Sequence, residues 1–309
     1  MRHALHPSLR AFVLAMLLTG LLLAACGGPS TPPAAEAPAG EPAPSSPEPV
    51  GDTPAAPEDD PSGQPGEESG SEVIVFAASS LTNAFDALAA EFEAQNPDVQ
   101  VVLNYASSLQ LATQLAEGAQ ADVFASANEQ QMASAVSAGR IELPTATFAT
   151  NRLTIIVPEG NPGNVTSVAA LAQEGVRFVT AVPGVPIRDY TNQMLEQMAA
   201  DPTFGPVFVD AVYGNLASEE SSVRQVVAKI ELGEADAAVV YVSDVAASPP
   251  DAIDQIEIPE EYNVIASYPV GLITDAPNRD LGAAFIEFVL SEQGQAILAE
   301  WGFEPAAGG

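Results

Sequence analysis

The alternation of short apolar runs with helical patterns from residue 73 onward constrains the fold most. The run 72–78 is a candidate for a buried strand, and Leu81, Phe85, Leu88 and Phe92 after it share one helical stripe. Strands that alternate with helices predict a parallel sheet with right-handed crossovers, and therefore an α/β fold. Further strand-like runs lie at 99–106, 122–126, 152–158 and 268–274.

The segment before this region has a different composition. Residues 27–72 are rich in Pro, Gly, Ala and acidic residues, and Val50 is their only large apolar side chain. Such a segment cannot bury enough apolar surface to offset the entropy of ordering, so we expect a disordered tether over 26–72. The residues that follow it suffice for one large or two small α/β domains.

The N-terminus has the pattern of an export signal. Arg2 and Arg10 precede an apolar run too short to be a confident membrane span. The run closes on Leu23-Ala24-Ala25-Cys26, which resembles the lipobox of bacterial lipoproteins. This resemblance implies that residues 1–25 are a lipoprotein signal peptide and that Cys26 carries the lipid. The alternatives are an ordinary signal peptide and an uncleaved anchor.

Residue counts exclude several functions. The histidines are His3 and His6, both in the predicted signal peptide, and Cys26 is the single cysteine. We therefore expect no Ser-His-Asp or Cys-His catalysis, no intramolecular disulfide and no imidazole zinc site, and we predict that the chain is not an enzyme. A formal charge of −32 with few basic residues argues against nucleic acid as a partner.

Three serine pairs stand where an apolar run or acidic stretch gives way to a helical pattern. They are 79–80, 107–108 and 221–222. A helix start leaves unpaired N–H donors and about half a positive charge. If such turns converge, they form a neutral, donor-rich socket for a small oxyanion. The alternative is that each serine only caps its helix. We expect Glu219 and Glu220, next to the third pair, to face outward.

Three motifs occur along the chain in the order "FAASSLT", "YASS" and "VVYVSD". Through these motifs, residues 73–303, approximately, closely resemble the molybdate-binding proteins of ABC importers. The resemblance implies a two-lobed periplasmic-binding-protein fold of type II. Each lobe would be a mostly parallel sheet flanked by helices. Lobe 1 would comprise 73–151 and 268–309, and lobe 2 would comprise 152–267.

The same resemblance implies the ligand-binding residues. The family holds a tetrahedral oxyanion with serine hydroxyls, backbone amides and one tyrosine. The alternatives are a structural helix position for Val223 and a core tyrosine for Tyr241. Carried over by position, the implied ligands are Ser80, Ser108, Ile187, Val223 and Tyr241, with Ser79 and Arg188 as further candidates.

The stretch "VPIRDY" (185–190) departs from the family pattern of Val-Pro, a small residue, Gly, any residue and Tyr. Ile187 replaces the small residue whose amide binds the oxyanion, and the missing glycine bears on the conformation of the loop. Arg188 would either neutralise a dianion near the cleft or lie outside it, facing outward or paired with Asp189.

The resemblance implies a lipid-anchored, monomeric binding protein at the outer face of the cytoplasmic membrane. Its ligand would be molybdate and also tungstate, so that molybdenum enters only as the bound oxyanion, and there would be no cofactor. Its partners would be the permease subunits of an ABC importer. The alternatives are sulfate or another small oxyanion as the ligand, and a sensing or adhesive lipoprotein that serves no transporter.

Overall fold

A computed structural model describes residues 71–306, which belong to one compact unit. The predicted signal peptide 1–25, Cys26 and all of the predicted tether except its last two residues lie outside the described residues. Those two residues, Ser71 and Glu72, begin the first strand rather than end the tether. Across 71–306, no helix combines the length and the apolar character needed to span a membrane.

The first of two sheets has the strand order β2-β1-β3-β10-β4. Strand β1 runs parallel to β2 and β3, whereas β10 runs antiparallel to β3 and β4. The strands are β1 (Ser71–Ala78), β2 (Val99–Ala106), β3 (Val123–Ala125), β4 (Ala146–Asn151) and β10 (Ala266–Leu272).

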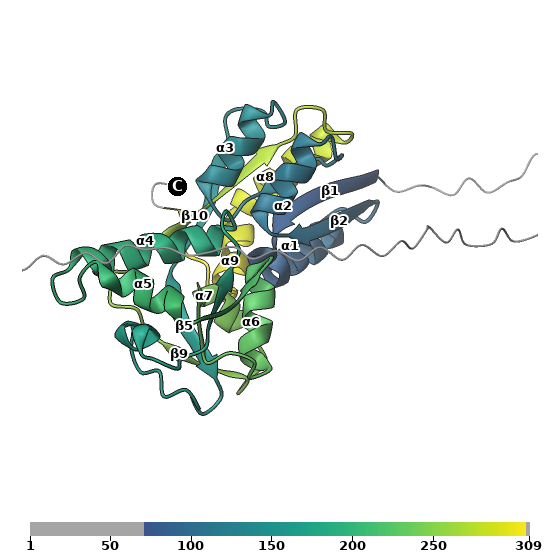
Figure 1. Ribbon diagram of the computed structural model, residues 1–309. Helices are drawn as coiled ribbons and strands as arrows, with labels where there is room; N and C mark the ends of the chain where they lie inside the picture. Colours follow the sequence, from purple (N-terminus) through teal and green to yellow (C-terminus); the bar gives the residue numbers. More distant parts are fainter. Residues whose placement is uncertain (1–70, 307–309) are drawn as a thin grey trace, which may run out of the picture. The chain divides into compact units, whose positions relative to one another are not determined.

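Helices from both ends of the described chain pack on this sheet, and together they form what we call the first lobe. Figure 1 shows the C-terminal helices α8 and α9, in yellow, returning to the strands of the N-terminal region. The elements are the 3-10 helix η1 (Ser79–Leu81), α1 (Thr82–Gln95), α2 (Ser108–Ala116), α3 (Glu129–Ser137), α8 (Arg279–Leu290) and α9 (Glu292–Glu300).

The second sheet has the order β7-β6-β8-β5-β9, with β6 parallel to β7 and β8, and β5 antiparallel to β8 and β9. With its helices it forms the second lobe. Its strands are β5 (Leu153–Pro158), β6 (Phe178–Ala181), β7 (Leu216–Glu220), β8 (Ala237–Tyr241) and β9 (Ile253–Ile256). Its helices are η2 (Val168–Ala172), α4 (Pro186–Ala200), α5 (Val207–Gly214), α6 (Val223–Glu231) and α7 (Val242–Ala247).

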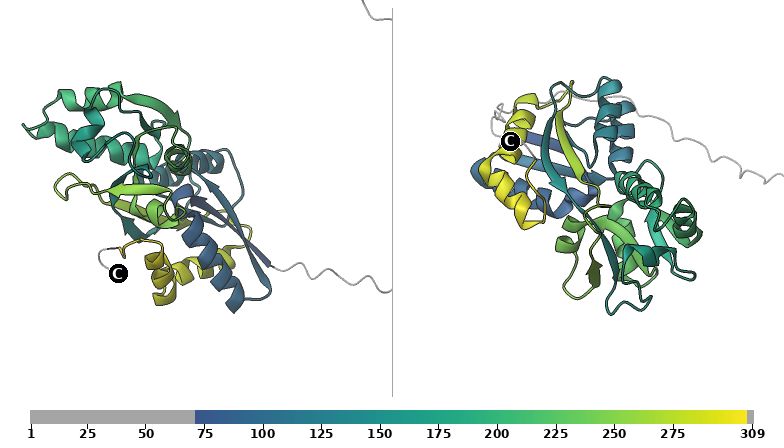
Figure 2. Two further views of the ribbon diagram at one scale, coloured as in Figure 1. Left: turned by 90° about the horizontal axis from the view of Figure 1, so that it is seen from below. Right: turned by 90° about the vertical axis from the view of Figure 1, so that its left-hand side faces the viewer.

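The predicted fold class is confirmed, with the difference that both sheets are mixed rather than mostly parallel. In each sheet the antiparallel strand is the one by which the chain enters from the other lobe: β10 in the first sheet and β5 in the second. Strand β4 ends at Asn151 and β5 begins at Leu153, so a nearly continuous extended segment leaves the first sheet and enters the second. This segment, which Figure 2 shows in teal, enters the second sheet antiparallel to its neighbours.

Aromatic side chains fill the core of the first lobe. Phe85 on α1 is fully buried, and its ring packs edge-to-face against Phe148 at 5.7 Å and Phe285 at 6.1 Å between centroids. These three residues come from the beginning, the middle and the end of the described chain. The lobe is therefore complete only when the C-terminal helices have returned to it.

We predict that Phe85→Ala lowers the free energy of unfolding by about 3–5 kcal/mol, because it removes a buried ring and leaves a cavity. Urea denaturation measures this change. Leu232→Ala is the control, since Leu232 is 72% exposed and its loss should change stability by less than about 0.5 kcal/mol. Equal effects of the two substitutions would contradict the packing described here.

Candidate functional site

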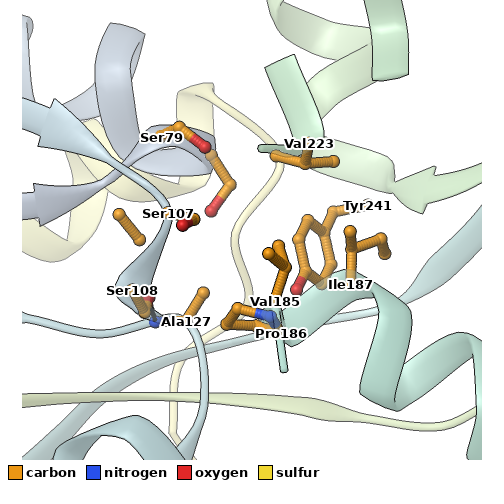
Figure 3. Close-up of a pocket in the computed structure, with 11 residues that line it drawn as sticks. Ser79, Ser107, Ser108, Ala127, Val185, Pro186, Ile187, Val223 and Tyr241 are labelled. Atoms are coloured by element: carbon orange, nitrogen blue, oxygen red, sulfur yellow. Dashed lines mark hydrogen bonds between the residues drawn. The ribbon is translucent and has the colours of Figure 1, made fainter. Parts of the chain in front are cut away.

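A small pocket lies between residues of the two lobes (Figure 3). The space left in it for the centre of a water-sized sphere is about 10 Å³, close to the roughly 10–15 Å³ that holds one water molecule. The pocket therefore has room for a small ion and not for a larger ligand. The first lobe contributes Ala78, Ser79, Ser80, Ser107, Ser108 and Ala127, and the second contributes Val185, Pro186, Ile187, Val223 and Tyr241.

All the residues predicted to bind the ligand line this pocket except Arg188. The first two serine pairs meet because of strand pairing. Strands β1 and β2 are parallel neighbours, and Ala78 at the end of β1 pairs with Ala106 at the end of β2. The turns that follow therefore begin side by side, at the carboxyl edge of the sheet where α/β proteins bind ligands.

The hydroxyls at these turns have different tasks. Ser107 caps α2: its Oγ accepts from the Gln110 N–H and donates to the Gln110 side chain. The Oγ of Ser108 accepts from the Ala127 N–H at 2.9 Å. Because its oxygen already accepts a protein hydrogen bond, Ser108 can offer its own hydrogen to a ligand.

The other first-lobe serine is held in a similar way. The phenol of Tyr268 donates to Ser80 Oγ at 3.3 Å, and both residues are buried. Burial raises the pKa of Tyr268 well above its usual range, so the phenol keeps the proton that it donates. Because Ser80 Oγ accepts this bond, its own hydrogen remains available for another acceptor. Ser80 lines the pocket, so a ligand there can be that acceptor.

The second lobe contributes helix starts. Ser222 caps α6, so Val223 is the first residue of that helix, and Ile187 is the second residue of α4, after Pro186. The N–H groups at such positions have no acceptor within their own helix and lie at its positive end. Both residues line the pocket, where these N–H groups suit an anion.

The altered stretch "VPIRDY" forms this helix start without a glycine at the family position. Pro186 stands at the first helical position, where its fixed φ suits the helix and its missing N–H is no loss. A tight turn lies directly before this stretch, at Gly184, whose φ is 89°. Ile187 is therefore compatible with a helix start that faces the pocket.

Tyr241 ends β8 and is 1% exposed, yet its hydroxyl has no hydrogen-bond partner among the described residues. Leaving a buried polar group unpaired costs about 1–3 kcal/mol. Burial, the largest cause, raises the pKa of Tyr241 well above its usual range, so the group is a neutral donor. A ligand that accepts a hydrogen bond in the pocket would satisfy it.

Arg188 lies outside the pocket, and the structure does not bring its charge to the predicted socket. Its Nη1 donates to the Glu219 carboxylate at 2.6 Å and to the Ala181 carbonyl at 3.0 Å. The guanidinium also lies over the Tyr213 ring, 4.4 Å from its centroid. Glu219 is therefore the partner of Arg188, not Asp189, and neither Glu219 nor Glu220 lines the pocket.

Comparisons with known proteins agree with this architecture. The family model for bacterial extracellular solute-binding proteins matches residues 73–304. The chain belongs to this family. Molybdate-binding protein ModA of Mycobacterium tuberculosis is 37% identical over 231 residues, which cover 75% of this chain and 84% of that protein. The resemblance inferred from the sequence motifs is thereby confirmed.

Two solved structures are also similar to this solute-binding protein. The substrate-binding domain of a putative molybdenum ABC transporter from Clostridium difficile is 26% identical, with a TM-score of 0.57 over 76% of this chain and 99% of that one. The sulfate-binding protein SubI from Mycobacterium tuberculosis is 20% identical, with a TM-score of 0.69 over 77% and 88% of the two chains. The second likeness concerns the fold alone.

Several residues around the site were not singled out by the sequence analysis. Tyr268 lies in the predicted strand 268–274, where its apolar neighbours indicate a core position and nothing marks its contact with Ser80. Arg224 and Asp244 follow pocket residues by one and three positions. Asp244 is also the last residue of the "VVYVSD" motif, and Arg224 has no sequence signal besides this proximity.

Asp244 is a fully buried carboxylate that contacts the backbone of Tyr241. Its Oδ2 accepts from the Tyr241 N–H at 3.1 Å. Its Oδ1 has no hydrogen-bond partner among the described residues, and Nε of Arg224 lies 3.8 Å from it. Burial raises the pKa of Asp244 to about 6, and the positive charge of Arg224 opposes this shift.

We predict a pH-dependent effect of Asp244→Asn. A pKa raised from 3.8 means that the folded state binds the Asp244 proton more tightly than the unfolded state. The contribution of Asp244 to the free energy of unfolding of wild type therefore falls as pH rises from about 4 to above 6. Asparagine keeps an acceptor for the Tyr241 N–H and does not titrate. From pH 4 to pH 7 the variant should therefore gain about 2 kcal/mol of unfolding free energy relative to wild type. Parallel pH profiles in urea denaturation would contradict this.

Proposed function

We propose that this solute-binding protein captures molybdate, and also tungstate, in the pocket between its lobes. The observation that carries the proposal is the buried Tyr241 hydroxyl, which has no partner among the described residues and faces a space also lined by Ser80 and Ser108. A tetrahedral dianion offers only acceptors, and these groups are donors. The relative named as a molybdate-binding protein supports this choice of ion.

The energetics of the proposed complex need no cation. Two serine hydroxyls, two backbone amides and one phenol can point at the ion. Hydrogen bonds to a charged partner contribute on the order of 1.5–3 kcal/mol each. Together they can supply the roughly 8–12 kcal/mol of micromolar to nanomolar binding after the costs of closing the lobes.

Selectivity follows from which groups line the pocket. Phosphate keeps a proton near neutral pH and needs an acceptor for it, and no carboxylate stands among the described residues that line the pocket. We therefore propose that phosphate is rejected. Sulfate has the same pattern of acceptors as molybdate, so it would be distinguished by size. Sulfate is the alternative ligand, and the fold of the sulfate-binding neighbour accommodates it.

We further propose the cellular setting that the sequence implies. The protein would be a monomer anchored by a lipid on Cys26 at the outer face of the cytoplasmic membrane, with 26–70 as the tether. The permease of an ABC importer would recognise the two lobes closed around the ion. The similar structure from Clostridium difficile, the substrate-binding domain of a putative molybdenum ABC transporter, supports this partner. The ion would be bound without covalent chemistry.

We predict that isothermal calorimetry of residues 71–309 detects submicromolar binding of molybdate and tungstate and no binding of phosphate. Sulfate should bind at least tenfold more weakly than molybdate, because the smaller ion cannot reach donors on both lobes equally well. Sulfate binding as tight as molybdate would select the alternative ligand. If none of the four ions binds, the proposed function is wrong.

Tyr241→Phe tests the phenol directly. We predict that it lowers molybdate affinity by roughly 10- to 100-fold, since a charge-assisted hydrogen bond is lost. Without ligand the variant should be as stable as wild type or more stable, because a buried hydroxyl without a protein partner is removed. Calorimetry and thermal unfolding measure the two effects.

Tyr262→Phe is the matched control for this substitution. The Tyr262 hydroxyl donates to Asp201 at 2.6 Å, and Tyr262 does not line the pocket. The substitution Tyr262→Phe should therefore change the free energy of unfolding without changing the affinity for molybdate. If Tyr241→Phe retains wild-type affinity, the phenol is not a ligand.

A further inference from the structure

The lobes are joined beside the pocket by side chains that reach from one lobe to the other. Arg224 on α6 donates from Nε to the Ser79 carbonyl at 3.1 Å and from Nη2 to Asn83 Oδ1 at 2.8 Å. On α3, the Gln131 amide donates to the Gly184 carbonyl at 2.9 Å. Each connection lies next to a residue that lines the pocket.

Of these connections, the one made by Arg224 is charged and makes two hydrogen bonds. Arg224 follows Val223 directly, and its acceptor Ser79 lines the pocket from the opposite lobe. Its side chain is 25% exposed, so water screens these bonds only in part. Charge-assisted hydrogen bonds of this kind are about twice as strong as neutral ones.

Arg224 is also linked to the residue that presents the phenol. Asp244, 3.8 Å from Arg224 Nε, accepts the backbone N–H of Tyr241 and is fully buried. A chain of contacts therefore runs from the Tyr241 turn through Asp244 and Arg224 to the Ser79 turn of the first lobe. It connects both sides of the pocket without entering it.

Tyr105 of the first lobe also lies near this guanidinium. Its hydroxyl donates to Asp86 at 2.8 Å. Burial and Asp86 raise the pKa of Tyr105, and the positive charge of Arg224 opposes this shift in part. The acceptors of Arg224 on the first lobe are thus the Ser79 carbonyl and Asn83 Oδ1, with Tyr105 nearby. These acceptors hold it only while the two lobes are together.

Access to the pocket requires the lobes to separate. Ser80, Ser108 and Tyr241 are at most 3% exposed, so an ion can enter or leave only when the two sides part. Parting breaks both bonds of Arg224 to the first lobe. These bonds therefore oppose release more than they oppose the first encounter with the ion.

We propose that Arg224 is a positioning residue that fastens the second lobe to the first over the bound oxyanion and thereby sets the rate of its release. This inference rests on the proposed function, since it concerns release of that ion. Arg224 touches Ser79 and Asn83 rather than the ion. It differs from Arg188, which makes its bonds within its own lobe.

The test uses sodium molybdate as the ligand and Arg224→Gln as the main variant. Calorimetry should show a roughly 10- to 100-fold loss of affinity, and stopped-flow measurements should place most of it in faster dissociation. Small-angle scattering should show that the variant contracts less on adding molybdate. Arg224→Lys, which keeps the charge but not the paired donors, should recover part of the affinity.

Arg177→Gln is the matched control, because it removes a guanidinium of the second lobe that pairs with Asp236 within that lobe. It should leave the dissociation rate unchanged. Asn83→Ala removes an acceptor on the first lobe and leaves the Asp244 contact in place. Combined with Arg224→Gln, it should cause no further loss, since both substitutions break the same connection.

The outcomes separate the two claims. If wild type binds molybdate and Arg224→Gln releases it within about twofold of the wild-type rate, the inference is wrong and the proposed function stands. If wild type binds none of the oxyanions, the proposed function is wrong and the inference falls with it. Should Arg224→Gln fail to fold, Asn83→Ala decides: unchanged dissociation overturns the inference.

Discussion

The site depends on the register between two neighbouring parallel strands. Ala78 and Ala106 are paired at the carboxyl ends of β1 and β2, so the chain leaves both strands at the same height and enters helical structure at once. The serines that follow are thereby placed side by side. A slip of one residue would shift one turn by about 3.3 Å along the strand direction relative to the other, and would separate these serines.

The same constraint explains how a strongly acidic chain would hold the oxyanion proposed above. The lining includes neither acidic nor basic side chains among the described residues, and its donors are hydroxyls and helix-start amides. Fixed dipoles close to the ion outweigh distant surface charges, whose field is screened beyond about a Debye length. Next to the pocket, the positive charge of Arg224 lies 3.8 Å from the buried Asp244, so these two charges partly offset each other.

Much of the first lobe could be predicted from the sequence, because its strands are apolar runs and its helices have clear stripes. The expected strands 72–78 and 99–106 agree with β1 and β2 within one residue. The polar strand β7 and the short strand β9 could not be predicted in this way. Strand β7 alternates in exposure but ends on two acidic residues, and β9 has only four residues, the middle two exposed and polar. Pairing with neighbours in the second sheet determines both strands.

The two arginines that follow pocket residues show where sequence reasoning reaches its limit. Arg188 and Arg224 both stand in the first turn of a helix, one position after a residue that lines the pocket. On α4 the third position turns toward β6 and Glu219, whereas on α6 the second position turns toward the other lobe. This difference depends on how the two lobes pack together, which no local pattern records.

The packing of the lobes also bears on selectivity. Hydroxyls and amides alone cannot distinguish two tetrahedral dianions, since both present the same acceptors. Size becomes a criterion only when the distance between the donors of the two lobes is fixed. Bonds such as those from Arg224 to Ser79 and Asn83 have a narrow range of length, so an ion of another radius must strain either them or its own contacts. Under the proposed function, closure of the lobes and recognition of the ion are therefore one physical process.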